Sequence, residues 1–171
     1  MGKQLQKQKI LKEVVWFLIK FNLLLIPFYA VIYLDINFYP IQSLFARFIA
    51  CIIKLFGYQP EVSEFFIYIG SMIIDISRDC IGWKSIYTLL ALVLASPGIL
   101  KKKIKFLLLW APILFLINTL RVIIIILVGL KFGAKYLEFL HKFLWQEVMI
   151  FVTIGIWWLW LRKTNKLNKK K

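Results

Sequence analysis

The sequence has few acidic residues, few cysteines and almost no histidine. Its 171 residues include only 8 aspartates and glutamates against 23 lysines and arginines, together with two cysteines and one histidine. A single histidine without a cluster of acidic side chains makes a poor metal site, so we expect neither a metal nor another cofactor. The two cysteines, Cys51 and Cys80, allow at most one disulfide.

What the sequence has instead is apolar surface, with 61% hydrophobic and 17% aromatic residues. That is more than a soluble core of this size can bury, which indicates an integral membrane protein. The net charge of +15 is compatible with nucleic-acid binding. However, the basic residues lie in three clusters separated by long apolar segments, so they cannot form one basic face, and we expect no nucleic-acid partner.

The basic clusters predict the topology. They are Lys3, Lys7, Lys9 and Lys12; Lys101, Lys102, Lys103 and Lys105; and Arg162, Lys163, Lys166, Lys169, Lys170 and Lys171. Under the positive-inside rule all three clusters are cytoplasmic, so an even number of spans separates them. The sequence therefore predicts that both termini are cytoplasmic.

About four transmembrane helices fit between these clusters. They are residues 14–33, 82–100, 104–130 and 143–161, flanked by basic tails at residues 1–12 and 162–171. No small-residue cleavage site follows the first span, so we expect a signal anchor in the membrane. The predicted fold is an all-α polytopic protein with a single membrane domain in the cell membrane.

The outer side carries one insertion before Cys80. Residues 41–57 predict an interfacial amphipathic helix with Arg47 and Lys54 on one face, in contact with membrane lipids. Its apolar positions are Ile41, Leu44, Phe45, Phe48, Ile52, Leu55 and Phe56. Residues 64–77, interrupted by Gly70 and Ser71, predict a short extracytoplasmic β-hairpin that leads directly to the cysteine.

Three polar residues are predicted to lie at one level of the membrane. At a rise of about 1.5 Å per residue, Cys80 lies about 32 Å from Lys101, and His141 lies about 32 Å from Arg162. Arg121 lies about 24 Å from Lys105, and its long side chain can extend further toward water. With a hydrocarbon core of about 30 Å, all three residues are expected near the outer boundary.

These three side chains together favour acyl transfer. Asp79 is a candidate N-cap, which would put Cys80 on the first helical turn and lower the pKa of its thiol. His141 can transfer protons, and the guanidinium of Arg121 can stabilise an oxyanion.

Each of the three residues also has a structural interpretation. Cys80 can be a buried apolar residue or can pair with Cys51 in a disulfide. Arg121 can anchor its helix to lipid headgroups, and His141 can be an interfacial polar residue.

The segment DCIGWKS at 79–85, the segment NTLR at 118–121 and His141 before the last span resemble the motifs of the exosortase and archaeosortase family. The resemblance covers residues 41–161 and implies a membrane-embedded sorting transpeptidase. It implies that the catalytic residues are Cys80, Arg121 and His141. It also implies supporting roles for Gly82, Ser85 and Asn118. Many family members have additional spans, so this chain is close to the minimal core.

The resemblance also implies a substrate and a reaction. The substrates would be surface proteins that end in a short motif, a hydrophobic helix and a basic tail. Cleavage would form a thioester on Cys80 at the extracytoplasmic face, and a nucleophile, such as a lipid-linked amine, would accept the new C-terminus. Asn118 would either orient Arg121 or make a hydrogen bond in helix packing.

Two other functions fit the same sequence. An intramembrane cysteine protease would resolve the thioester with water and attach nothing. A non-enzymatic subunit of a transport or assembly complex would use Arg121 and Glu147 as a buried ion pair and Cys80 as a structural residue.

Overall fold

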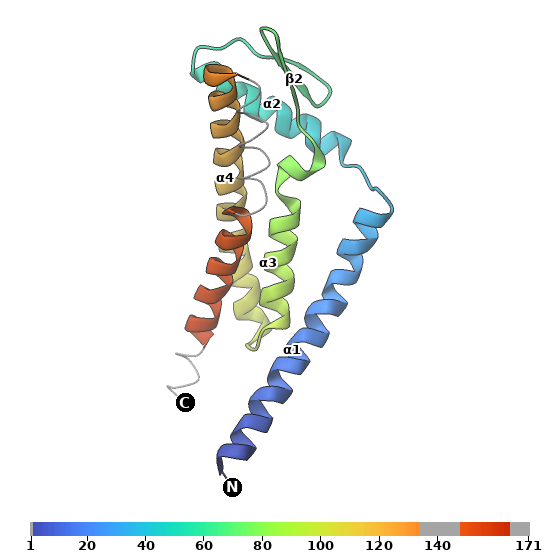
Figure 1. Ribbon diagram of the computed structural model, residues 1–171, viewed down its shortest axis with the longest axis vertical. Helices are drawn as coiled ribbons and strands as arrows, with labels where there is room; N and C mark the ends of the chain where they lie inside the picture. Colours follow the sequence, from blue (N-terminus) through green and yellow to red (C-terminus); the bar gives the residue numbers. More distant parts are fainter. Residues whose placement is uncertain (1, 134–147, 165–171) are drawn as a thin grey trace. The chain divides into compact units, whose positions relative to one another are not determined.

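The computed structural model describes residues 2–133 and 148–164 of the chain (Figure 1). The elements in chain order are α1 (Gly2–Tyr33), α2 (Tyr39–Leu55), β1 (Glu61–Ser63), β2 (Phe66–Ile69), β3 (Met72–Asp75), the 3₁₀ helix η1 (Arg78–Ile81), α3 (Trp83–Ala95) and α4 (Leu100–Phe132). Residues 148–164 are also helical. The chain divides into two compact units. The first unit consists of Met1–Ile36, Tyr87–Trp110 and Ile154–Lys171, and the second consists of Asn37–Ile86 and Ala111–Thr153.

Two of the described helices are long and apolar enough to cross a membrane, at Gln6–Tyr33 and Leu100–Phe132. They contain the predicted spans 14–33 and 104–130. The predicted span 82–100 is shorter in the structure, because α3 ends at Ala95, before Ser96, Pro97 and Gly98. Part of the predicted span 143–161 lies outside the described residues. The four-span topology and the cytoplasmic termini stay predictions.

In the first unit, polar side chains connect apolar helices. The Tyr87 hydroxyl donates to the Leu24 carbonyl at 2.7 Å, and the Trp157 indole donates to the Ser96 hydroxyl at 2.8 Å. Lys103 donates to the Leu94 carbonyl at 2.8 Å, near the C-terminus of α3. These bonds satisfy polar groups that would be costly to leave unpaired in an apolar environment.

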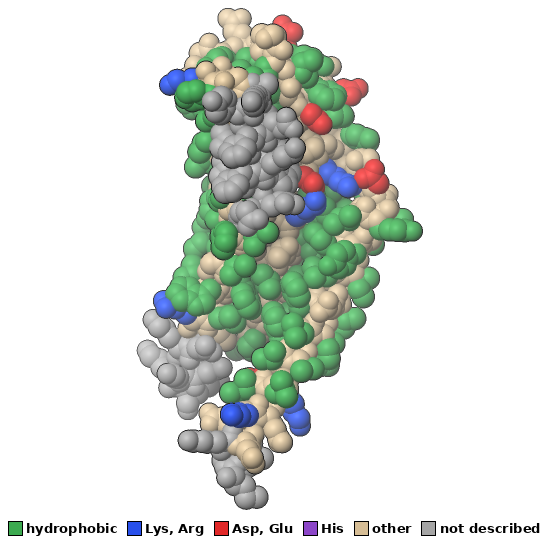
Figure 2. Space-filling model, viewed as in Figure 1, with side chains coloured by type: hydrophobic (Ala, Val, Ile, Leu, Met, Phe, Trp, Pro, Cys, Tyr) green, Lys and Arg blue, Asp and Glu red, His purple; other side chains and the backbone are tan. Residues whose placement is uncertain are grey.

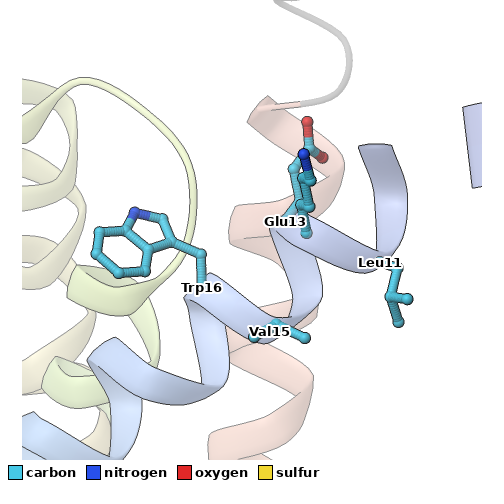
Figure 3. Close-up of a pocket in the computed structure, with 5 residues that line it drawn as sticks. Leu11, Glu13, Val15 and Trp16 are labelled. Atoms are coloured by element: carbon cyan, nitrogen blue, oxygen red, sulfur yellow. The ribbon is translucent and has the colours of Figure 1, made fainter. Parts of the chain in front are cut away.

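Most of α1 exposes apolar side chains, and Figure 2 shows large hydrophobic areas on the face drawn. In the most apolar stretch of α1, no residue is buried inside the protein. Figure 3 shows a surface hollow on this helix, lined by Leu11, Lys12, Glu13, Val15 and Trp16. None of the candidate site residues lines it. Such a surface suits a helix in contact with lipid.

The second unit contains an antiparallel sheet of three strands in the order β1-β2-β3. The sequence predicted a two-stranded hairpin at 64–77, whereas β1 adds a third strand that pairs Val62 with Ile67. β2 and β3 flank the Gly70-Ser71 turn and pair Ile67 with Ile74. Ile67, Ile69 and Ile74 are buried, so one face of the sheet contributes to the hydrophobic core.

Helix α2 packs in this unit mainly through residues outside the predicted apolar stripe. Its buried residues follow an i, i+3, i+4 pattern, namely Gln42, Phe45, Ala46, Ile49, Ala50 and Ile53. Of the predicted apolar stripe, Phe45 is buried and Ile52 partly buried, while Ile41, Leu44, Phe48, Leu55 and Phe56 are exposed. On the inner face, Ala46 and Ala50 allow close packing beside the larger Phe45, Ile49 and Ile53. The interfacial position of α2 stays a prediction.

Candidate functional site

The segment between β3 and α3 carries Cys80 and is tied to the core at its start. The Ile76 amide donates to the Phe65 carbonyl at 3.1 Å, which extends the β2-β3 pairing by one residue. The Ile76 carbonyl accepts a hydrogen bond of 3.1 Å from the Gln42 side chain. Both Ile76 and Gln42 are buried, so the chain enters the Cys80 turn from a fixed position.

Cys80 lies on η1 and is only 3% exposed. Its amide donates to the Ser77 carbonyl at 2.9 Å, and its Sγ lies 3.4 Å from the Ser77 Oγ. Ser77 therefore contacts the cysteine through both its main chain and its side chain. The Ser77 hydroxyl is thus in hydrogen-bond contact with the sulfur.

The predicted helix cap at Asp79 is wrong in its detail. Ser77 occupies the N-cap position of η1, and Asp79 lies inside this turn. The Asp79 carboxylate instead accepts a hydrogen bond of 2.7 Å from the Lys84 ammonium. Helix α3 begins at Trp83, after Gly82, so Cys80 precedes the α-helix and is not on its first turn.

Gly82 adopts a left-handed conformation with φ of 79° and separates η1 from α3. A Cβ atom at this position would lie 2.7 Å from Cγ of Asn118. The Asn118 amide donates to the Cys80 carbonyl at 2.7 Å, and the asparagine is 1% exposed. The space beside Gly82 is therefore filled by Asn118.

We expect Gly82→Ala to lower the free energy of unfolding by about 3 kcal/mol, from left-handed strain plus the overlap with Asn118. Gly70→Ala is the matched control, because Gly70 also has a positive φ but has no atom within 4 Å of a Cβ. That variant should lose only about 1 kcal/mol. Thermal unfolding of both variants in detergent measures the difference, and equal losses would contradict the role given to the Asn118 contact.

Asn118 and Arg121 lie one turn apart on α4, and both are buried. The bond from Asn118 to Cys80 corresponds to the packing role that the sequence left open for this asparagine. Arg121 lies close enough to Cys80 for its positive charge to act on the thiol. The structure therefore brings two of the three predicted catalytic residues together.

Burial raises the pKa of the Cys80 thiol, and this effect outweighs the others. Hydrogen bonds from Ser77 and the charge of Arg121 lower the pKa, while the negative charge of Asp75 raises it. The sequence predicted a lowered pKa from a helix N-terminus, but Cys80 is too deeply buried for that. The raised pKa keeps the fraction of thiolate small at neutral pH, and this fraction increases as the pH rises. The thiolate is the nucleophilic form of the cysteine.

The remaining predicted residues lie elsewhere or outside the description. His141 lies outside the described residues. Ser85 is partly buried near the start of α3.

Cys51 is exposed on α2 and Cys80 is buried, and both are free thiols, so the structure does not contain the disulfide considered for them. Within residues 2–133 and 148–164, no three His, Cys, Asp or Glu side chains gather as a metal site.

Sequence reasoning missed Ser77 and Gln42. Ser77 lies three residues before Cys80, a spacing at which a serine can bond within a turn. Gln42 lies on α2 in register with Phe45, Ala46 and Ile49, and this i, i+3, i+4, i+7 spacing could have placed it on the buried face.

Comparison with known proteins gave one family match. A family model described as transmembrane exosortase matches residues 9–167. No curated protein and no solved structure matches the chain significantly. The family match covers both α4 and the segment that carries Cys80, and exosortases in general are cysteine-dependent membrane transpeptidases of protein sorting. The chain therefore belongs to the transmembrane exosortase family.

Proposed function

We propose that this protein cleaves a C-terminal sorting signal from surface proteins through a thioester on Cys80 and transfers the new C-terminus to an extracytoplasmic nucleophile. The observation that carries the proposal is that Cys80 and Arg121 are both buried and that the charge of Arg121 acts on the Cys80 thiol. A buried guanidinium whose charge acts on a thiol supplies a stabiliser for developing negative charge beside a candidate nucleophile.

In the first half-reaction, His141 takes the proton from the Cys80 thiol, and the thiolate attacks the carbonyl carbon of the scissile peptide bond. A C–S bond forms, and the carbonyl electron pair moves onto oxygen. Arg121 stabilises this oxyanion through its fixed N–H donors. When the C=O bond re-forms, the C–N bond breaks and His141 protonates the departing amine.

In the second half-reaction, an amine from outside attacks the thioester carbonyl and gives a proton to His141. The C–S bond breaks, an amide forms, and the thiolate is released and protonated. His141 is assigned to both proton transfers because the family resemblance and the depth count put it at the level of Cys80. Nothing in this sequence of steps requires a redox partner.

The proposed substrates are surface proteins with a short motif, a hydrophobic helix and a basic tail. The apolar surface of α1 supports a membrane location, and the three basic clusters of the sequence support an active site on the outer face. In that orientation, the motif of a substrate leaves the membrane at the level of Cys80, while its helix stays in lipid.

Hydroxylamine tests whether the reaction is acyl transfer. Purified protein in vesicles is incubated with a surface protein of this type, with and without hydroxylamine. A thioester predicts that the cleaved product carries a C-terminal hydroxamate, which mass spectrometry detects. Cleavage that gives only a free carboxylate when hydroxylamine is present would contradict a thioester that an outside amine can resolve, which the proposed transfer requires. If the protein in vesicles does not cleave the surface protein at all, the result would favour a non-enzymatic subunit.

A further inference from the structure

We propose that Ser77 is a positioning residue that holds the Cys80 nucleophile by donating its hydroxyl hydrogen bond to the thiolate. The inference rests on the proposed role of Cys80 and assigns to Ser77 a function that the sequence did not suggest. Its starting point is the 3.4 Å contact between Ser77 Oγ and Cys80 Sγ.

The direction of this hydrogen bond depends on the state of the sulfur. In the neutral thiol, either the hydroxyl or the S–H group can donate. The thiolate has no proton, so only the hydroxyl of Ser77 can donate to it. The bond then becomes charge-assisted and is stronger than the one made with the thiol. Ser77 therefore favours the reactive form of Cys80.

The two residues are held in this arrangement from both ends. The Gln42 side chain donates to the Ile76 carbonyl, one residue before Ser77, and the Asn118 side chain donates to the Cys80 carbonyl. Both amides are buried, at 4% and 1% exposure. The amide of Cys80 also bonds to the Ser77 carbonyl, which closes the turn. The hydroxyl is thus oriented before a substrate arrives.

The charged groups around the sulfur do not make Ser77 redundant. Arg121 of α4 favours the thiolate, whereas Asp75 of β3 and burial disfavour it. Asp79 and Lys84 are paired with each other across Gly82. Hydrogen bonding by Ser77 is the largest of the effects that lower the pKa of Cys80, ahead of the charge of Arg121.

The test compares threonine and valine at position 77, in a protein that also carries Cys51→Ser so that Cys80 is the only thiol. Threonine keeps the hydroxyl, and valine has nearly the same shape without it. Ser77 has an extended backbone, with φ −62° and ψ 161°, which β-branched residues accept. Ser77→Ala is measured alongside as a smaller variant without the hydroxyl, and Ser63→Ala on β1 is the exposed control.

The measurement is the rate at which iodoacetamide alkylates Cys80 between pH 6 and pH 10. We expect Ser77→Thr and Ser63→Ala to match the parent protein. At pH 7.5, Ser77→Val and Ser77→Ala should be alkylated about tenfold more slowly, with the rate profile displaced to higher pH. The same displacement in both variants without the hydroxyl separates its loss from a change in packing.

The inference would be overturned if Ser77→Thr and the variants without the hydroxyl had the same dependence of alkylation rate on pH. An equal loss of rate in all of them would show that the shape of the side chain, and not its hydroxyl, is the cause. Alkylation is measured without substrate, so these results are independent of sorting. Processing that survives Cys80→Ala would overturn the proposed function instead.

Discussion

We expect Cys80→Ala to abolish cleavage of a tailed surface protein and Cys51→Ala to leave cleavage unchanged. The reason for the difference is position, because Cys80 is buried beside Arg121 and Cys51 is exposed on the outside of α2. Without the sulfur, no thioester can form, so the rate should fall to background. The size of the surface protein in cells carrying each variant measures the effect.

Cys51→Ala also serves as the control for a disulfide. If both substitutions abolish cleavage equally, the two cysteines act together and the nucleophilic role of Cys80 is wrong. Unchanged cleavage in Cys80→Ala would contradict the role directly. The thermal midpoint of Cys80→Ala is measured in parallel, because a lost sulfur in a buried site also removes packing.

Arg121→Gln is the second substitution with a large expected effect. We expect kcat to fall by about 10²- to 10³-fold, because glutamine removes the positive charge that we propose as the stabiliser of the oxyanion. Arg121→Lys should recover part of the rate, since lysine keeps the charge but not the planar set of donors. Initial rates over a range of substrate concentrations separate this loss in kcat from any change in KM.

Arg47→Gln is the matched control for Arg121, because Arg47 is exposed on α2 and far in sequence from the site. This variant should keep the parent kcat. A rise in KM alone for Arg121→Gln would indicate that the arginine binds substrate without stabilising the oxyanion. Equal kcat values for Arg121→Gln and the parent protein would contradict its assigned role.

The sequence predicted that Cys80 and Arg121 lie at a similar membrane level, because helix rise is nearly constant. Counting residues from the basic clusters put both side chains near the outer boundary, although Arg121 was about 8 Å deeper than Cys80 in this count. In the structure, the charge of Arg121 acts on the thiol. The same count applies to His141, which lies outside the described residues, so its position stays a prediction.

The surroundings of Cys80 could not be predicted, because they depend on tertiary contacts. Asn118 reaches the Cys80 carbonyl only because Gly82 has a positive φ and no side chain. The sequence predicted an apolar stripe on α2 but not which residues of this helix pack in the core, where Ala46 and Ala50 lie on the same face as Ile49 and Ile53. Burial of Cys80 reversed the predicted direction of its pKa shift.

The most direct test of the proposed mechanism is the mass of the Cys80 peptide during turnover. The reaction is stopped with acid within a single turnover, the protein is digested, and the peptides are analysed by mass spectrometry. We predict that the peptide with Cys80 gains the mass of the substrate segment before the scissile bond, and that neutral hydroxylamine removes this mass. Cleaved substrate without acylated Cys80, or an acyl group on another residue, would contradict the mechanism.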